Sequence, residues 1–133
     1  MFTEEEAERR KINFVEGQNA VVIVDEDLTD LGAINPAFAE LPQYRQATAE
    51  DLLLLPSSSF IGSLVGDNPQ LINGVTVPLE DKWVLTPEEQ EALKTATDAY
   101  NTKISEVATS KGLALVDLNA ILQEAATTGI VFD

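Results

Sequence analysis

The feature that most constrains the fold of this chain is a long helical pattern that begins at Thr86. Thr86 is a suitable N-cap, Pro87 suits the first helical position, and Glu89 completes a capping box. Apolar residues then recur at spacings of three and four, at Leu93, Ala96, Tyr100, Ile104, Val107 and Ala108. Gly112 follows the last turn, where a left-handed residue commonly ends a helix. The pattern predicts one amphipathic helix that ends at Lys111.

Two short apolar runs predict buried strands on either side of this helix in the sequence. Ala20–Val24 is continuous and rich in β-branched residues, which is typical of a parallel strand covered on both faces. Leu113–Leu118 follows the long helix and precedes a final helix, Ala120–Thr128, with Asn119 as its cap. The order strand, helix, strand, helix favours an α/β fold, with a small parallel sheet flanked by helices.

Two shorter helices are predicted nearer the N-terminus. Thr3 is followed three residues later by Glu6, which is the spacing of a capping box. Thr48 and Asp51 have the same spacing and precede a run of leucines, so they predict a helix that stops before Pro56.

The chain is long enough for one domain, and we predict a single domain over residues 1–133. Its first part, residues 1–85, is predicted to be rich in loops, and residues 86–133 are predicted to form a helix-strand-helix unit. Within the first part, residues 72–78 and 82–86 alternate weakly between apolar and polar, which predicts a short hairpin or two edge strands.

The charge of the chain excludes several classes of partner. Eight basic residues face 23 acidic ones, and the formal charge is -15. Nucleic-acid backbones and anionic lipid surfaces repel such a chain, so we expect neither as a partner. No apolar run approaches the roughly 18 residues of a membrane span, so we expect no direct membrane insertion. The acidic first residues have no apolar core of a signal peptide, and localisation stays open.

The absence of cysteine and histidine limits the chemistry of these residues. Disulfides, zinc sites made of Cys and His, and a Ser-His-Asp triad are all excluded within residues 1–133. We therefore assign no catalytic, cofactor-binding or metal-binding residue and expect no cofactor.

The stretch "FIGSLVGDNPQ" has some likeness to an esterase active site. A nucleophile elbow needs glycine two residues after the serine, but Gly66 stands three residues after Ser63. A Gly-Asp-Ser-Leu block needs an acid before the serine, and Gly62 stands there. No spacing supports a Ser-Lys dyad with Lys82, Lys103 or Lys111. The favoured interpretation is a loop whose two glycines allow tight turns.

A carboxylate-rich loop follows the first predicted strand. Asp25, Glu26, Asp27 and Asp30 could suit a hard cation such as calcium, but the ligand spacing of an EF-hand is absent. The alternative is a strand end at which Asp27 or Thr29 caps a turn.

Asp117 lies at the predicted carboxyl end of the second strand, where open α/β sheets bind ligands. The alternative is that Asp117 helps Asn119 to start the last helix.

Four stretches resemble SGNH/GDSL-type hydrolases of Bacteroidetes-like bacteria. They are "RKINFVEGQNAVVIVDEDLTDL", "RQATAEDLLLLPSSSFIGSLVG", "INGVTVPLEDKWVLTPEEQEAL" and "KGLALVDLNAIL". The resemblance implies part of a three-layer α/β/α fold and an enzyme that cleaves carboxylic esters of lipids or acylated carbohydrates. It also implies export of the parent enzyme as a secreted protein or lipoprotein.

None of these stretches is a catalytic motif of that family. The resemblance therefore implies an internal segment without the Ser block and the Asp-x-x-His block, inactive by itself and able to self-associate through an uncovered sheet. Only the full-length parent would then bind an ester substrate. The alternative is a stand-alone acidic α/β module that binds a protein or carbohydrate partner.

Overall fold

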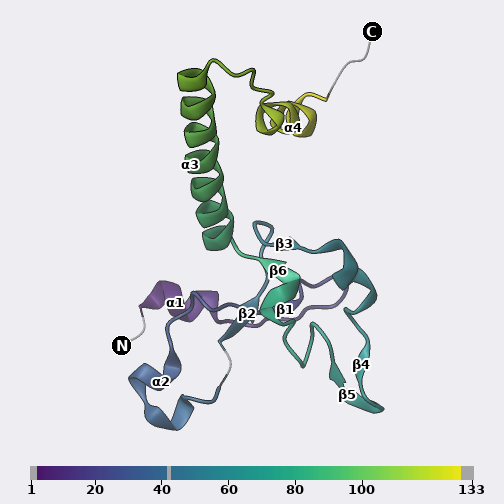
Figure 1. Ribbon diagram of the computed structural model, residues 1–133. Coiled ribbons are helices and arrows are strands. Elements are labelled where there is room, and N and C mark those ends of the chain that lie inside the picture. The colour runs from purple at the N-terminus through teal and green to yellow at the C-terminus, as the bar shows by residue number, and fades with distance from the viewer. Residues whose placement is uncertain (1–2, 42, 130–133) are drawn as a thin grey trace. The chain divides into compact units, whose positions relative to one another are not determined.

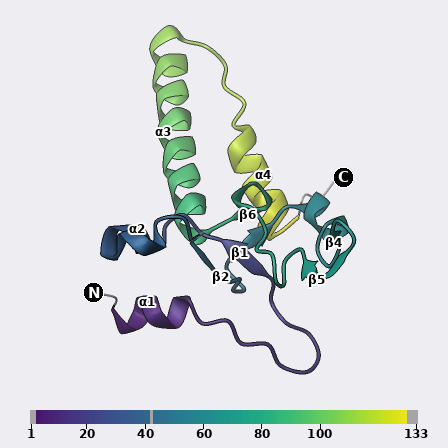
Figure 2. The ribbon, with the colours of Figure 1, turned by 90° about the horizontal axis from the view of Figure 1, so that it is seen from below.

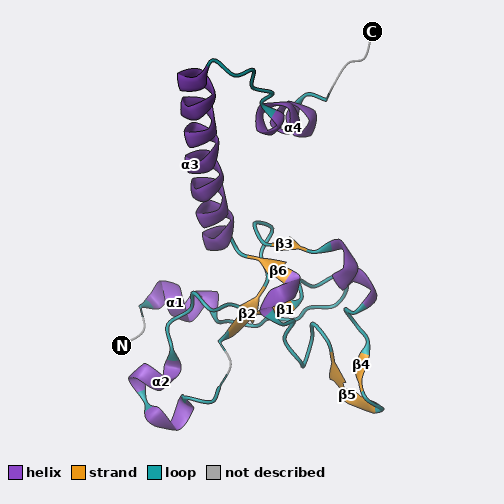
Figure 3. Cartoon of the chain, in the orientation of Figure 1, coloured by secondary structure: helices purple, strands orange, loops and turns teal. Residues whose placement is uncertain are grey.

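The computed structural model describes residues 3–41 and 43–129, and it divides into two compact units, Met1–Gln90 and Glu91–Asp133. Figure 1 labels the helices, which are α1 (Glu4–Arg9), α2 (Leu31–Ile34), α3 (Pro87–Lys111) and α4 (Leu118–Thr127). Figure 3 colours the strands, which are β1 (Val22–Val24), β2 (Tyr44–Gln46), β3 (Leu52–Leu53), β4 (Leu64–Val65), β5 (Asn68–Ile72) and β6 (Val84–Leu85). Short 3-10 turns cover Pro36–Phe38, Leu55–Ser59 and Asp81–Trp83.

The expected parallel sheet is wrong. All pairs of named strands among the described residues are antiparallel: β1 with β2, β3 with β6, and β4 with β5. The one parallel contact of β1 is an isolated bridge between Ile23 and Leu79. A parallel-sheet α/β/α layer is therefore not present in the described chain.

β1 is buried for a different reason from the one predicted. On one edge β1 pairs with β2, with Ile23 opposite Arg45. On the other edge, backbone hydrogen bonds join it to the segment that follows β5, from Val22 N to Gly74 O and from Val24 N to Leu79 O, each 2.8 Å long. β1 is thus hydrogen-bonded on both edges and buried, and a continuous apolar run indicates this burial without fixing the direction of its neighbours.

The helix predicted from Thr48 is also wrong. The local contact forms, since the Thr48 N–H donates to Asp51 Oδ2 over 2.7 Å. However, β3 follows instead of a helix, and Leu52 and Leu53 pair with Leu85 and Val84 of β6. Tertiary strand pairing therefore overrides the local helix signal, as it often does for apolar runs of this length.

A short hairpin exists, but it lies before the position predicted from the sequence. β4 and β5 pair across a two-residue turn at Gly66 and Asp67, where Gly66 has φ +62°. A positive φ at this place favours glycine because it has no Cβ. The later segment 82–86 contributes β6, which pairs with β3 and not with residues 72–78.

The core of the first unit is small. Ile23, Leu79 and Val84 form its buried centre. Phe60 and Trp83 pack against this centre, and their rings stack with centroids 5.5 Å apart. A stacked aromatic pair adds to the apolar burial and fixes the segments that carry the two rings.

The long helix predicted from Thr86 is confirmed as α3. The Glu89 N–H donates to Thr86 Oγ1 over 3.3 Å, and the Thr86 N–H donates to Glu89 Oε2 over 2.8 Å, which is a complete capping box. α3 ends at Lys111, and Gly112 has φ +63°.

The strand predicted over Leu113–Leu118 is wrong. Residues 113–117 have no regular secondary structure, and Leu118 begins α4. A strand needs a partner strand for its backbone hydrogen bonds. All strands of the described chain lie in the first unit, so the second unit offers residues 113–117 no such partner. The apolar side chains of this unit are mostly exposed, and Ala108 is the one buried apolar residue among those described.

Candidate functional site

A buried ion-pair network organises the first unit. The guanidinium of Arg45, on β2, donates two hydrogen bonds of 2.7 Å to the carboxylate of Asp51. The same guanidinium donates through Nε to Asp25, which directly follows β1. The three side chains are 4% exposed or less. Buried charges persist only when they are paired and hydrogen-bonded, and this bidentate arrangement meets that need.

Within the network, the pKa values of Arg45 and Asp51 are shifted by their contact with each other. Burial by itself raises the pKa of Asp51, but hydrogen bonds from Arg45 and Thr48 outweigh it and hold this pKa below its ordinary value. The hydrogen bond to Asp51 in turn raises the pKa of Arg45. Both groups therefore stay charged at neutral pH.

A second arginine extends the network to the surface. Arg9, at the end of α1, donates to Asp25 over 3.2 Å and to Glu88 over 3.0 Å. Glu88 lies in the first turn of α3, within the first unit. Arg9 thus joins α1, the end of β1 and the start of α3 around one cavity.

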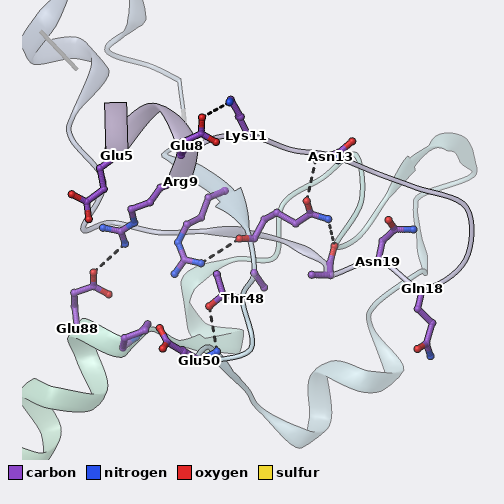
Figure 4. A pocket seen from close by; sticks show the side chains of 15 residues that line it. Glu5, Glu8, Arg9, Lys11, Asn13, Gln18, Asn19, Thr48, Glu50 and Glu88 are labelled. Carbon is purple, nitrogen blue, oxygen red and sulfur yellow. Dashed lines mark hydrogen bonds and ion pairs between the residues drawn. The ribbon is translucent and has the colours of Figure 1, made fainter. Parts of the chain in front are cut away.

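This cavity is a polar pocket with a volume of about 690 Å³. Such a volume falls in the range of about 300–1,000 Å³ that is usual for small-molecule sites. Acidic, basic and amide side chains line it, namely Glu5, Glu8, Glu50, Glu88, Arg9, Lys11, Arg45, Asn13, Gln18, Asn19 and Gln46. Figure 4 shows the pocket, with Gln18 and Glu88 at its opposite ends. We refer to it below as the polar pocket.

Hydrogen bonds hold the walls of the polar pocket in place. The segment between α1 and β1 makes a wide loop (Figure 2), and Asn19 closes part of it by accepting from Val15 N and donating to Val15 O, each over 2.8 Å. Gln46 accepts from Asn13 N over 3.1 Å and donates to Ala20 O over 2.9 Å. The loop is therefore tied to β2.

Two hydrogen bonds hold the hydroxyl of Ser63. It donates to Phe60 O over 2.6 Å and accepts from Asn73 Nδ2 over 3.0 Å. Lys82 and Lys103 pair with Glu80 and Glu106, not with this serine. Gly62 and Gly66 have positive φ angles, as the loop interpretation expects.

The carboxylate loop does not gather its acids at one point. Asp25 is fully buried between two arginines, and Asp30 caps α2 by accepting from Gly32 N over 2.8 Å. Asp27 Oδ2 accepts from Thr86 Oγ1 over 3.5 Å. Residues 3–41 and 43–129 contain no group of three or more acidic, His or Cys side chains that could hold a metal ion.

Asp117 is a helix cap. It is the N-cap of α4 and accepts from Ala120 N over 2.9 Å, while Asn119 lies inside the helix. The helix-starting role is therefore confirmed for Asp117, although the cap itself is Asp117 and not Asn119.

Sequence reasoning missed the two arginines and the polar pocket. Arg45 is the one basic residue between Lys11 and Lys82 in a strongly acidic chain, and this is a signal that could have suggested a buried pair. Its partners could not have been selected, because Asp25 and Asp51 lie 20 and 6 residues away from Arg45.

Among the helices that the structure describes, none combines the length and the apolar content that a membrane crossing requires. Comparison of the chain with protein-family models, with curated proteins and with solved structures finds no match.

Proposed function

We propose that residues 1–133 are a non-catalytic segment of an SGNH/GDSL-type ester hydrolase. The likeness of four long stretches to that family suggests the enzyme class. The observation that carries the proposal is the apolar surface that the second unit does not cover with its own residues. A segment that belongs to a larger enzyme needs such a surface, because it packs against other residues of that enzyme.

The apolar side chains of the second unit are unusually exposed. Tyr100 and Val116 are 71% exposed, and Leu122 is 68% exposed. Others with 42–66% exposure are Leu93, Ile104, Val107, Leu113, Leu115, Leu118 and Ile121. Soluble monomers rarely leave so many large apolar residues uncovered in one region. The cover for this region is not supplied by the unit itself.

The chemistry of Ser63 supports a non-catalytic role. An ester hydrolase of this type activates its serine with a histidine, and the 133 residues contain none. The Ser63 hydroxyl donates a hydrogen bond to the backbone carbonyl of Phe60. A carbonyl oxygen is not a general base, so this contact does not activate the serine as a nucleophile.

A second candidate is a stand-alone acidic module that binds a protein or carbohydrate partner. The ion-pair network of Arg45, Asp25 and Asp51 and the core around Ile23 favour it, because both are complete within the first unit. Such a unit needs no other chain to satisfy its buried charges.

The test is to express the whole open reading frame that encodes these residues beside residues 1–133 alone. With p-nitrophenyl acetate, we expect saturable hydrolysis by the product of the whole reading frame and none above a serum-albumin background by residues 1–133. Ser63→Ala should change neither rate. Hydrolysis by residues 1–133 that Ser63→Ala abolishes would contradict the proposal. A whole reading frame that encodes no Ser block and no Asp-x-x-His block would favour the binding module.

A further inference from the structure

Asn73 is the one asparagine of the chain that a glycine follows. This pair is reactive in water, because glycine has no side chain to shield its backbone nitrogen from the neighbouring side-chain amide. Asn73 and Gly74 directly follow β5 (Figure 1). Gly74 has φ +78°, and a Cβ at this position would lie 3.3 Å from Cγ1 of Val21. The fold therefore requires the glycine and keeps a reactive pair at this place.

Both reacting groups of this pair are engaged in the folded chain. The side chain of Asn73 donates through Nδ2 to Ser63 Oγ over 3.0 Å, and Asn73 is only 5% exposed. The buried Gly74 donates its N–H to Val77 O over 2.7 Å. Its nitrogen must lose this proton before it can attack the amide of Asn73. The hydrogen bonds and the burial together suppress the reaction.

We propose that Asn73 and Gly74 form a deamidation site that the hydroxyl of Ser63 holds closed until the loop opens locally. In the open form, hydroxide removes the proton of the Gly74 N–H, and the nitrogen bonds to Cγ of Asn73. The side-chain nitrogen leaves as ammonia after it takes a proton from water. Water then opens the five-membered succinimide ring at either carbonyl, which leaves an aspartate or an isoaspartate at position 73. No electron is transferred, and water is the one co-reactant.

The product does not suit the closed loop. The hydroxyl of Ser63 gives its one proton to Phe60 O, so its oxygen meets position 73 as an acceptor. A carboxylate at position 73 would only accept as well, and a buried carboxylate without a donor is unfavourable. An isoaspartate also lengthens the backbone beside two hydrogen bonds, from Asn73 N to Ser63 O and from Gly62 N to Asn73 O. The reaction therefore favours the open loop and cannot be reversed by refolding.

The change reaches the aromatic pair of the core. The ring of Phe60 stacks on Trp83, and its backbone carbonyl is joined to Asn73 through Ser63. We expect deamidation to loosen this stack. The proposal goes beyond ester hydrolysis and does not depend on it, because all these residues belong to the first unit and act without a substrate.

The test is incubation of the full chain in mildly alkaline buffer, with and without a denaturing concentration of guanidinium chloride. Peptide mass spectrometry follows the replacement of NH2 by OH at each asparagine. We expect Asn73 to convert faster than every other asparagine in denaturant, and far more slowly in the folded chain. The ratio of the two rates should agree in order of magnitude with the hydrogen-exchange protection of the Gly74 amide, because the same opening frees this N–H from Val77.

Two serine variants assign the protection to the contact with Asn73. Ser63→Ala removes the contact and leaves residues 72–75 unchanged. It should speed deamidation of the folded chain about fivefold, the factor that corresponds to the loss of one ordinary hydrogen bond, and should leave the rate in denaturant unchanged. Ser59→Ala is the matched control, because the hydroxyl of Ser59 donates to Pro56 O and not to Asn73. It should change neither rate.

An asparagine-to-aspartate variant reproduces one product. Asn73→Asp should lower the urea midpoint measured by the fluorescence of Trp83. Asn68→Asp is the matched control, since Asn68 is exposed and its Oδ1 accepts from Gln70 N, which a carboxylate also does. It should lower the midpoint less.

Three results would each overturn the proposal. They are equal deamidation rates of Asn73 in the folded and denatured chain, no acceleration by Ser63→Ala in the folded chain, and equal midpoints of the two aspartate variants. If Ser63→Ala does not fold, the comparison of deamidation with hydrogen exchange in the parent chain decides, and disagreement between the two would overturn the proposal.

Discussion

At the scale of single residues, Arg45 has the largest predicted effect on stability. Its replacement by methionine leaves the carboxylates of Asp25 and Asp51 buried without their main partner. Removing one partner of a buried ion pair costs about 3–5 kcal/mol, although Arg9 still neutralises part of the charge of Asp25. We therefore expect Arg45→Met to lose a large part of the free energy of unfolding of the first unit.

Urea unfolding followed by the fluorescence of Trp83 measures this loss, because Trp83 is the one tryptophan and packs on the core. Lys11→Met is the matched control. The pair of Lys11 with Glu8 has both side chains about two-thirds exposed, at 66% and 67%, so its loss should cost no more than about 1 kcal/mol. Equal effects of the two substitutions would show that the buried network does not stabilise the unit.

Asp51 makes the stability of the folded chain depend on pH. Its pKa is lower in the folded chain than its ordinary value of 3.8, so folding favours the charged carboxylate. The stability that it contributes is fully present above pH 3.8 and is lost as the pH falls below that value, through the folded pKa. Asp51→Asn should therefore be less stable than the parent at neutral pH, and the difference should shrink in acid.

Urea unfolding at a series of pH values between about 2 and 7 checks this. Asp67→Asn is the control, because Asp67 is an exposed turn residue with no side-chain partner among the described residues. A difference between parent and Asp51→Asn that stayed constant down to the lowest pH would contradict the assignment.

At the scale of the elements, the start of α4 separates two possible caps. Asp117 accepts from Ala120 N, whereas Asn119 lies within the first turn. Loss of an N-cap costs about 0.5–2 kcal/mol. We expect Asp117→Ala to reduce the hydrogen-exchange protection of the amides of α4 by this amount, and Asn119→Ala to reduce it less. A larger effect of Asn119→Ala would restore the cap predicted from the sequence.

At the scale of the whole molecule, net charge and apolar exposure act in opposite directions. The charge of -15 opposes association of copies, while the apolar side chains of the second unit favour it. We expect residues 1–133 to bind the dye ANS, and to associate more strongly at high salt because screening weakens the repulsion between copies. The self-association expected through an uncovered sheet would then take place through α3 and α4.

Fluorescence of ANS and sedimentation at low and high salt measure these properties. Tyr100→Gln together with Leu122→Gln should reduce both, because it removes two of the most exposed apolar side chains. Leu55→Gln, in the first unit, is the matched control and is 90% exposed. A monomeric, ANS-silent chain at all salt concentrations would show that this apolar surface is covered within the chain.

The sequence alone determined the features that depend on contacts within about four residues. The capping box of Thr86 and Glu89, the length of α3 and the stop at Gly112 follow from local hydrogen bonds and backbone preferences, so they could be read directly. The cap at Thr3 is equally local, since its hydroxyl accepts from Glu6 N. The turn glycines of the Ser63 loop belong to the same class.

Only the tertiary structure decided which distant segments meet. Strand pairing satisfies backbone groups with residues far along the chain, so an apolar run indicates burial and leaves the partner and its direction open. Thr48 shows the consequence, because its local contact with Asp51 forms while the leucines after it pair with β6. The polar pocket depends on Arg45 for the same reason, since its guanidinium joins two acids that no local rule selects from 23.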